Sequence, residues 1–462
     1  MNEQHTDSSK DFKKSLQTRH MVMLALGGVI GTGLFLSSGY SIHQAGPLGA
    51  LIAYVLGAGV MYLVMVCLGE LAVQIPETGS FSVYAARYLG PGTGYTVAWL
   101  YWLTWAVAIG SEFIGAGSQM RYWFPDVSVG VWCAVFAVAI FLVNAISVRT
   151  FAETEFWLSI IKVVTVIVFL IVGAGIMLGF THHKPIGFSN FTREGLFPTG
   201  GWSMIMTLLM VLFAFSGSEL VAVAAGEAQD PQHNLKRAIR MTIVRLSIFF
   251  IGTIFVLAML MPREQAGVNV SPFVVVFGMA GIPYADDVVN FVIITAMLSA
   301  ANSGLYAASR MLWTLGDQGF VARRYARLTK KGIPLNAVVV SMIGAFASLA
   351  SSIYAPDTVY LALVSISGLA AVVVWMSIAA AQMSFRRHFV ANGGQLDELK
   401  YRVKPYPLVP IAALLACTLS LVGVAFDPEQ RISLYFGIPF IAWCYLVHWY
   451  KQRRFRQRQV QQ

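Results

Sequence analysis

Runs of about twenty apolar residues recur along nearly the whole chain of 462 residues, and short polar segments separate them. A hydrocarbon core of about 30 Å is crossed by a helix of about 20 residues. The pattern therefore predicts an all-α polytopic membrane protein with twelve transmembrane helices. These helices are expected near residues 21–45, 47–73, 93–119, 128–147, 156–180, 203–226, 239–261, 287–315, 335–353, 358–384, 406–425 and 432–450.

Two of the apolar runs are interrupted halfway by small and polar residues. The first run contains GGVIGTGLF from residue 27, and the sixth contains FAFSGSELV from residue 213. Each glycine inside a helix costs about 0.5–1 kcal/mol relative to alanine. The two interruptions lie five helices apart, so corresponding helices of the two halves run in opposite directions. This arrangement is typical of an inverted repeat with broken helices.

The repeat defines the expected domain organisation. A transporter core occupies residues 21–384, with one repeat at 21–180 and the inverted repeat at 203–384. Two appended transmembrane helices follow in residues 385–450. A polar N-terminal segment, 1–20, and a basic tail, 451–462, are expected in the cytoplasm.

Opened backbone inside a membrane is tolerated only where it is buried by protein or lines a cavity. Free N–H groups at the start of a half-helix suit a carboxylate, and free carbonyl groups suit an ammonium group or a sodium ion. An α-amino acid carries both charges. The alternative is that the glycines only allow close helix packing. The paired interruption favours a binding site for a zwitterion.

The charge distribution indicates orientation and excludes several classes of protein. Of 32 Lys and Arg residues, 24 fall in segments that share one side of the membrane with both termini, and 5 fall on the other side. The positive-inside rule makes the first side cytoplasmic, so the net charge of +10 does not indicate nucleic acid. We recognise no HExxH or CxxC pattern, and we expect no metal, no cofactor and no enzymatic activity. His182 and His183 are expected on a solvated outer loop.

Five segments together resemble the amino acid permeases of the amino acid–polyamine–organocation superfamily. Besides the two interruptions, they are GELAVQIPETGSFSVYAARYLGP, SIIKVVTVIVF and SAANSGLYAASRMLW. The resemblance covers residues 15–450. It is closest to bacterial permeases for arginine, lysine and S-methylmethionine, the last around YLGPGTGYTVAWLYWLTW.

The resemblance implies a fold of the leucine-transporter type, with a 5+5 inverted repeat, and proton-coupled uptake across the bacterial inner membrane. It implies that the first break meets the substrate carboxylate and that carbonyls of the second meet the amino group. An aromatic residue in the second break is expected to cover the substrate, with Phe215 at the matching position and Phe213 as a rival. The other expected contacts are Ile30, Gly31, Thr32, Gly33, Ala214 and Ser216.

Lys162 lies inside the fifth apolar run, and charges at this depth indicate function. In proton-coupled members of the family, a lysine of this helix takes the place of a sodium ion between helices 1 and 8. The resemblance therefore implies a proton-coupling role for Lys162. A lysine that extends toward the interface is the alternative.

Two glutamates are further candidates. Glu112 is expected to relay protons or to pair with a cationic substrate side chain; a buried structural glutamate is the alternative. S-methylmethionine permeases carry a small residue there, which argues against that substrate. Glu219 either caps the second half-helix or attracts a basic side chain.

Several polar residues leave more than one interpretation open. Ser299, Asn302 and Ser303 share one helix face, where they line the pocket, hold a sodium ion or bond neighbouring helices. Glu70, Glu227 and Arg310 are either ion pairs of an inner gate or interfacial charges.

The sequence predicts an alternating-access importer of an L-amino acid, preferably basic, together with a proton. The amino acid, the proton and membrane lipid are the expected partners, with no obligate protein partner. The alternatives within the fold are a permease for neutral amino acids or S-methylmethionine, a sodium symporter and an exchanger. A receptor and an intramembrane enzyme are alternatives from other classes.

Overall fold

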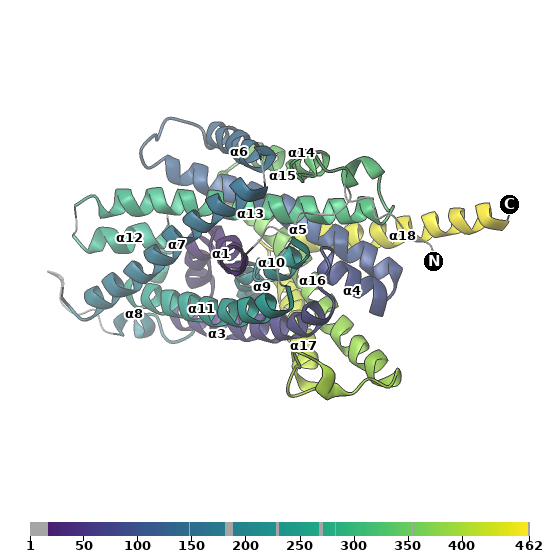
Figure 1. Cartoon of the computed structure of the whole chain (residues 1–462). Coiled ribbons are helices and arrows are strands. Elements are labelled where there is room, and N and C mark those ends of the chain that lie inside the picture. The colour runs from purple at the N-terminus through teal and green to yellow at the C-terminus, as the bar shows by residue number, and fades with distance from the viewer. Residues whose placement is uncertain are drawn as a thin grey trace.

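The computed structural model describes residues 17–146, 148–180, 188–227, 231–267, 271–281, 283–352 and 354–460. The loop histidines His182 and His183, and most of the N-terminal segment 1–20, lie outside these ranges. Within them the fold is helical and ten helices are long and apolar enough to cross a membrane. Most of these helices run along a common direction, and α18 extends beyond the others (Figure 1).

The helices of the structure occupy every predicted span, and their starts differ most at α7 and α11, which begin eight residues before their predicted spans. Their bounds are α1 Thr18–Val29, α2 Thr32–Phe35, α3 Ser37–Gln74, α4 Ser80–Tyr88, α5 Pro91–Met120, α6 Val129–Ile146, α7 Val148–Met177, α8 Ser189–Thr192, α9 Ser203–Phe215, α10 Leu220–Val223, α11 Pro231–Leu260, α12 Pro272–Met279, α13 Ala285–Asp317, α14 Leu335–Ser341, α15 Ile343–Ser348, α16 Pro356–Ala391, α17 Leu408–Phe426 and α18 Ile432–Val460. A 3₁₀ turn, Ala224–Glu227, follows α10.

Ten long helices correspond to twelve predicted spans because two of the predicted spans do not form a separate long helix. The first predicted span comprises α1, α2 and the start of α3. It is divided from the second at Gly46, where φ is 74° and Pro47 follows. The ninth predicted span is two short helices, α14 and α15, which meet at Met342. The hydrophobic pattern did not predict this interruption.

The broken helices lie in the protein interior. The apolar part of the sixth span is wholly buried, whereas less than two fifths of the apolar part of α6, α7, α17 and α18 is buried. Exposed residues such as Val138 on α6, Ile171 on α7 and Leu415 on α17 present apolar surface outward. Such a surface suits lipid, so the outer helices shield the interrupted backbone that the bilayer would not tolerate.

Two buried ion pairs close one end of the helix bundle, which we name the basic end because the Arg- and Lys-rich segments 316–334 and 385–405 lie there. Glu227 accepts hydrogen bonds from Arg310 Nε at 3.0 Å and Tyr306 Oη at 2.8 Å. Glu70 accepts bonds from Arg386 at 2.6 and 2.7 Å. Removing one partner of such a buried pair typically costs about 3–5 kcal/mol. Both pairs join separate helices and hold this end together.

Candidate functional site

The first break frees backbone groups on both of its sides. α1 ends at Val29, α2 begins at Thr32, and the Gly31 N–H bonds to the Val29 carbonyl at 3.1 Å. In a continuous helix the Gly31 N–H would bond to Gly27 and the Thr32 N–H to Gly28. The break therefore leaves the Gly27 carbonyl and the Thr32 N–H in need of other partners.

Two side chains of opposite charge supply these partners. Lys162 Nζ donates to the Gly27 carbonyl at 2.5 Å. The Glu112 carboxylate accepts from the Thr32 N–H at 3.0 and 3.2 Å and from Thr32 Oγ1 at 3.0 Å. A cation thus stands at the end of one half-helix and an anion at the start of the next, where the helix dipoles favour them. A Cβ atom on Gly31 would lie 2.6 Å from Glu112 Oε1, so glycine permits this contact.

The backbone of the second break is bound by a glutamate of the same segment. α9 ends at Phe215, and Gly217 has a φ of 102° before α10 begins. The Gly217 N–H donates to both oxygens of Glu219 at 3.1 Å, and Trp375 Nε1 donates to Oε2 at 3.2 Å. Glu219 is fully buried. Glu219 thus holds the backbone of the break itself, and its side chain makes no hydrogen bond to the first N–H groups of α10.

The two breaks lie against each other. A Cβ atom on Gly217 would stand 2.9 Å from the carbonyl carbon of Gly28, and one on Gly33 would stand 2.7 Å from Ala214 Cα. These distances are shorter than any normal Cβ contact. The glycines therefore have both of the roles considered from the sequence. They open the backbone, and they allow the two half-helices to pack in contact. The predicted interruption of helices 1 and 6 is confirmed.

The two candidates for the gate, Phe215 and Phe213, lie on different faces of α9. The ring of Phe215 stacks on Phe250 with 4.6 Å between centroids and lies 6.1 Å from Tyr54. It therefore packs between α9, α11 and α3 instead of covering the break. Phe213 lies on another face of α9, toward Gly368 of α16. In this structure Phe215 does not cover the break, and both residues stay candidates for the gate.

The polar face of α13 is directed mainly toward α7. Ser299 Oγ donates to Glu155 Oε1 at 2.5 Å, and Asn302 Nδ2 donates to Oε2 at 3.1 Å. Of the three interpretations left open by the sequence, these bonds match the one in which Ser299 and Asn302 join neighbouring helices, because both side chains are directed toward α7 and not toward the break. Ser303 remains near the break: its Oγ has no partner among the described residues, and its Cβ lies beside Gly28.

Three partners of these groups were missed from the sequence. Trp375 on α16 and Tyr360, which donates to the Thr32 carbonyl at 3.4 Å, carry no local signal beyond an aromatic ring in an apolar run. Glu155 was placed just before the predicted span at 156–180, whereas α7 begins at Val148. An earlier helix start would have shown Glu155 to be a charge at membrane depth.

Hollows approach the first break from the end opposite the basic end. One of about 330 Å³ is lined by residues that include Ser118, Arg121 and Pro356. A much smaller one of about 10 Å³ shares Ser118 and Pro356 with it and reaches Tyr360. That volume is about the size of one water molecule. Tyr360 therefore separates the larger hollow from Thr32.

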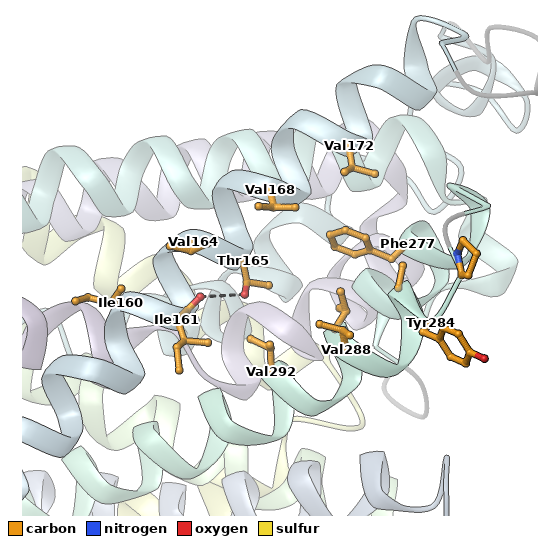
Figure 2. A pocket seen from close by; sticks show the side chains of 13 residues that line it. Ile160, Ile161, Val164, Thr165, Val168, Val172, Phe277, Tyr284, Val288 and Val292 are labelled. Carbon is orange, nitrogen blue, oxygen red and sulfur yellow. Dashed lines mark hydrogen bonds between the residues drawn. The ribbon is translucent and has the colours of Figure 1, made fainter.

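A larger apolar pocket is not suited to an amino acid. It has a volume of about 550 Å³ and lies between α7, α12 and α13 (Figure 2). Its lining is mainly Val, Ile, Phe and Pro, and Thr165 Oγ1 bonds to its own helix at Ile161. The hydroxyl of Tyr284 points away from the pocket (Figure 2). Such a lining offers no partner to a carboxylate or an ammonium group.

Comparison with known proteins agrees with this architecture of paired broken helices. Residues 20–461 match the family described as amino acid permease. A putative histidine permease of Bacillus subtilis is 51% identical, over 99% of this chain and 97% of its own length. The amino-acid permease RocC of B. subtilis is 49% identical, over 94% of each chain. The lysine-specific permease LysP of Escherichia coli is 39% identical, over 97% of this chain and 95% of its own.

The chain belongs to the amino acid permease family of the amino acid–polyamine–organocation superfamily. Its relatives are named permeases, so it is a transporter rather than an enzyme. The family assignment and the fold class expected from the sequence are confirmed.

Proposed function

We propose that this protein imports an L-amino acid with a basic side chain, together with a proton, across the bacterial cytoplasmic membrane. The observation that carries the proposal is the pair of charged caps on the first break. Lys162 holds the Gly27 carbonyl, and Glu112 holds the Thr32 N–H. Both caps are buried groups that gain or lose a proton, and both bind the backbone expected to hold the substrate.

Glu112 links proton binding to substrate binding. A substrate carboxylate at the first break competes with the Glu112 carboxylate for the Thr32 N–H, and two like charges repel there. Protonation of Glu112 removes one charge and releases that N–H. The substrate ammonium group then binds carbonyls of Phe213, Ala214 and Ser216, with the Phe213 ring as the gate.

The orientation follows from the positive-inside rule, which makes the basic end cytoplasmic. The ion pairs Glu227–Arg310 and Glu70–Arg386 then close the cytoplasmic side. The hollow that leads to Tyr360 opens outside. Substrate enters from this hollow, and import requires the basic end to open.

A basic substrate is supported by two observations. Relatives at 51% and 36% identity are named as histidine permeases, and another at 39% is named as lysine-specific. In addition, the buried Glu219 places a negative group at the second break. Relatives named for γ-aminobutyric acid and for threonine and serine show that the family also handles other substrates.

Uptake by purified protein in proteoliposomes tests the proposal. Labelled lysine, arginine and histidine are offered under a proton gradient or a sodium gradient, with S-methylmethionine and neutral amino acids as competitors. We expect accumulation of a basic amino acid under the proton gradient alone. Competition by neutral or aromatic compounds only would refute the substrate class. Accumulation under the sodium gradient alone would refute proton coupling.

Glu219→Gln is expected to weaken inhibition by lysine by about tenfold and inhibition by norleucine by less than about threefold. Norleucine has a similar length without the charge. The amide oxygen still accepts from the Gly217 N–H, so this bond to the backbone is kept while the negative charge is lost. Inhibition constants for the two compounds on the same reconstituted protein provide the measurement. An equal loss for both would assign Glu219 to binding of the backbone alone.

A further inference from the structure

Glu155 is a buried carboxylate that the transport mechanism above does not use. It lies on α7 with 1% of its surface exposed, where α1, α7 and α13 pack together (Figure 1). Its oxygens accept from Ser299 and Asn302 of α13. Asn302 is oriented for this role, since its Oδ1 accepts from Asn144 Nδ2 at 2.7 Å. Neutral donors therefore hold the carboxylate.

The hydrogen bonds of Glu155 accommodate a proton as well as a charge. Ser159 Oγ lies 3.5 Å from Glu155 Oε1 and donates to the Met23 carbonyl at 2.9 Å. A serine hydroxyl has one proton and free lone pairs. While that proton serves Met23, Ser159 accepts a bond from a protonated Glu155. Glu155 can therefore keep its hydrogen bonds at this position both as a carboxylic acid and as a carboxylate.

Glu155 and Lys162 converge on one residue of the first break. They lie seven residues apart, two turns on the same face of α7. Lys162 Nζ binds the Gly27 carbonyl, and a Cβ atom on Gly27 would collide with Glu155 Oε1. In this structure the two side chains meet the same glycine but form no hydrogen bond or ion pair with each other.

The other elements around Glu155 present few charges. α1 presents the backbone of Met23 and Gly27, and its Arg19 and His20 pair with Glu153. Near Glu155, α6 contributes the side-chain amide of Asn144, and α13 contributes the amide of Asn302 and the hydroxyl of Ser299. Lys162 is therefore the ionisable group best placed to exchange a proton with Glu155.

A pair of stacked aromatic rings, Phe151 and Tyr306, lies between Glu155 and the basic end. Phe151 lies one turn before Glu155 on α7. Its ring stacks parallel to the ring of Tyr306 on α13, with 4.7 Å between the two centroids. Tyr306 donates to Glu227, which also pairs with Arg310. Opening the basic end must separate these groups, and that motion would admit water to Glu155.

We propose that Glu155 receives the proton from Lys162 and releases it to the cytoplasm when the basic end opens. In the first step Lys162 leaves the Gly27 carbonyl and comes within hydrogen-bond reach of Glu155, and its ammonium group then gives a proton to the Glu155 carboxylate, which leaves a neutral amine and a carboxylic acid. In the second step the acid gives that proton to water. The inference rests on the proposed proton coupling.

The test compares Glu155→Gln with Glu155→Asp in proteoliposomes, with labelled lysine as the probe. Lysine exchange at equal pH on both sides reports binding and conformational cycling, whereas accumulation under a proton gradient reports coupling. Glutamine preserves the shape but cannot carry the proton. We expect it to lower accumulation by about tenfold or more and exchange by less than about threefold. Aspartate should retain more accumulation. Glu153→Gln, on the exposed side of α7, is the control.

The outcomes separate the two proposals. Normal accumulation in Glu155→Gln, or better accumulation with glutamine than with aspartate, overturns the role of Glu155. An equal loss of exchange and accumulation also overturns it, because that result indicates packing. If the glutamine variant does not fold, Glu155→Asn replaces it as the isostere of aspartate. Failure of the unmodified protein to accumulate any of lysine, arginine and histidine under a proton gradient refutes the coupling itself.

Discussion

Lys162→Ala is expected to abolish proton-driven accumulation, with a loss of about 100-fold or more relative to the unmodified protein. The substitution removes the cation that holds the Gly27 carbonyl and leaves that buried acceptor without its donor. An unpaired buried polar group costs about 1–3 kcal/mol, which destabilises the broken helix but not the whole fold. Uptake of a labelled basic amino acid under a proton gradient provides the measurement.

Exchange of the same substrate at equal pH is expected to persist in Lys162→Ala, although more slowly. Lys451→Ala is the matched control, because Lys451 also donates to a backbone carbonyl, that of Phe320, but at an exposed position. It should accumulate substrate normally. Undiminished accumulation in Lys162→Ala would remove the lysine from the coupling mechanism and favour the alternative of a lysine that only anchors its helix.

Gly217→Ala is expected to eliminate both exchange and accumulation. At a φ of 102° an alanine is strained by about 1–2 kcal/mol. Its methyl group would also stand 2.9 Å from the backbone of Gly28, and relief of such an overlap costs about 1–3 kcal/mol. The backbone of the two half-helices cannot yield as a flexible side chain would. The breaks must therefore separate, which disrupts the expected binding site. Binding and exchange of labelled substrate measure the loss.

Gly59→Ala is the control for this experiment, since nothing lies within 4 Å of the added methyl group on that helical residue. Alanine should leave transport unchanged and stabilise α3 by about 0.5–1 kcal/mol. Transport by Gly217→Ala at the level of the unmodified protein would show that close contact between the breaks is not needed.

Local pattern was enough to predict most of the membrane helices and the breaks in helices 1 and 6, but not the division of the ninth span into α14 and α15. A run of about 20 apolar residues has few alternatives to a membrane helix, and glycines in its middle mark opened backbone. Lys162 and Glu112 were singled out for the same reason, because a charge at membrane depth is costly wherever the helix packs. Phe215 could not be oriented in this way. Its ring is apolar on either face of α9, and only the position of Phe250 shows which face it occupies.

The sequence by itself determined the all-helical membrane fold, the interruptions in helices 1 and 6 and the buried charges beside them, since each depends on the cost of placing a residue in lipid. Only the tertiary structure decided which charge meets which backbone group. Lys162 is 135 residues from Gly27, and Glu112 is 80 residues from Thr32. Such distant pairs form because interrupted backbone groups must find a partner inside the membrane, and the packing of α5 and α7 against the first break determines which side chain reaches them.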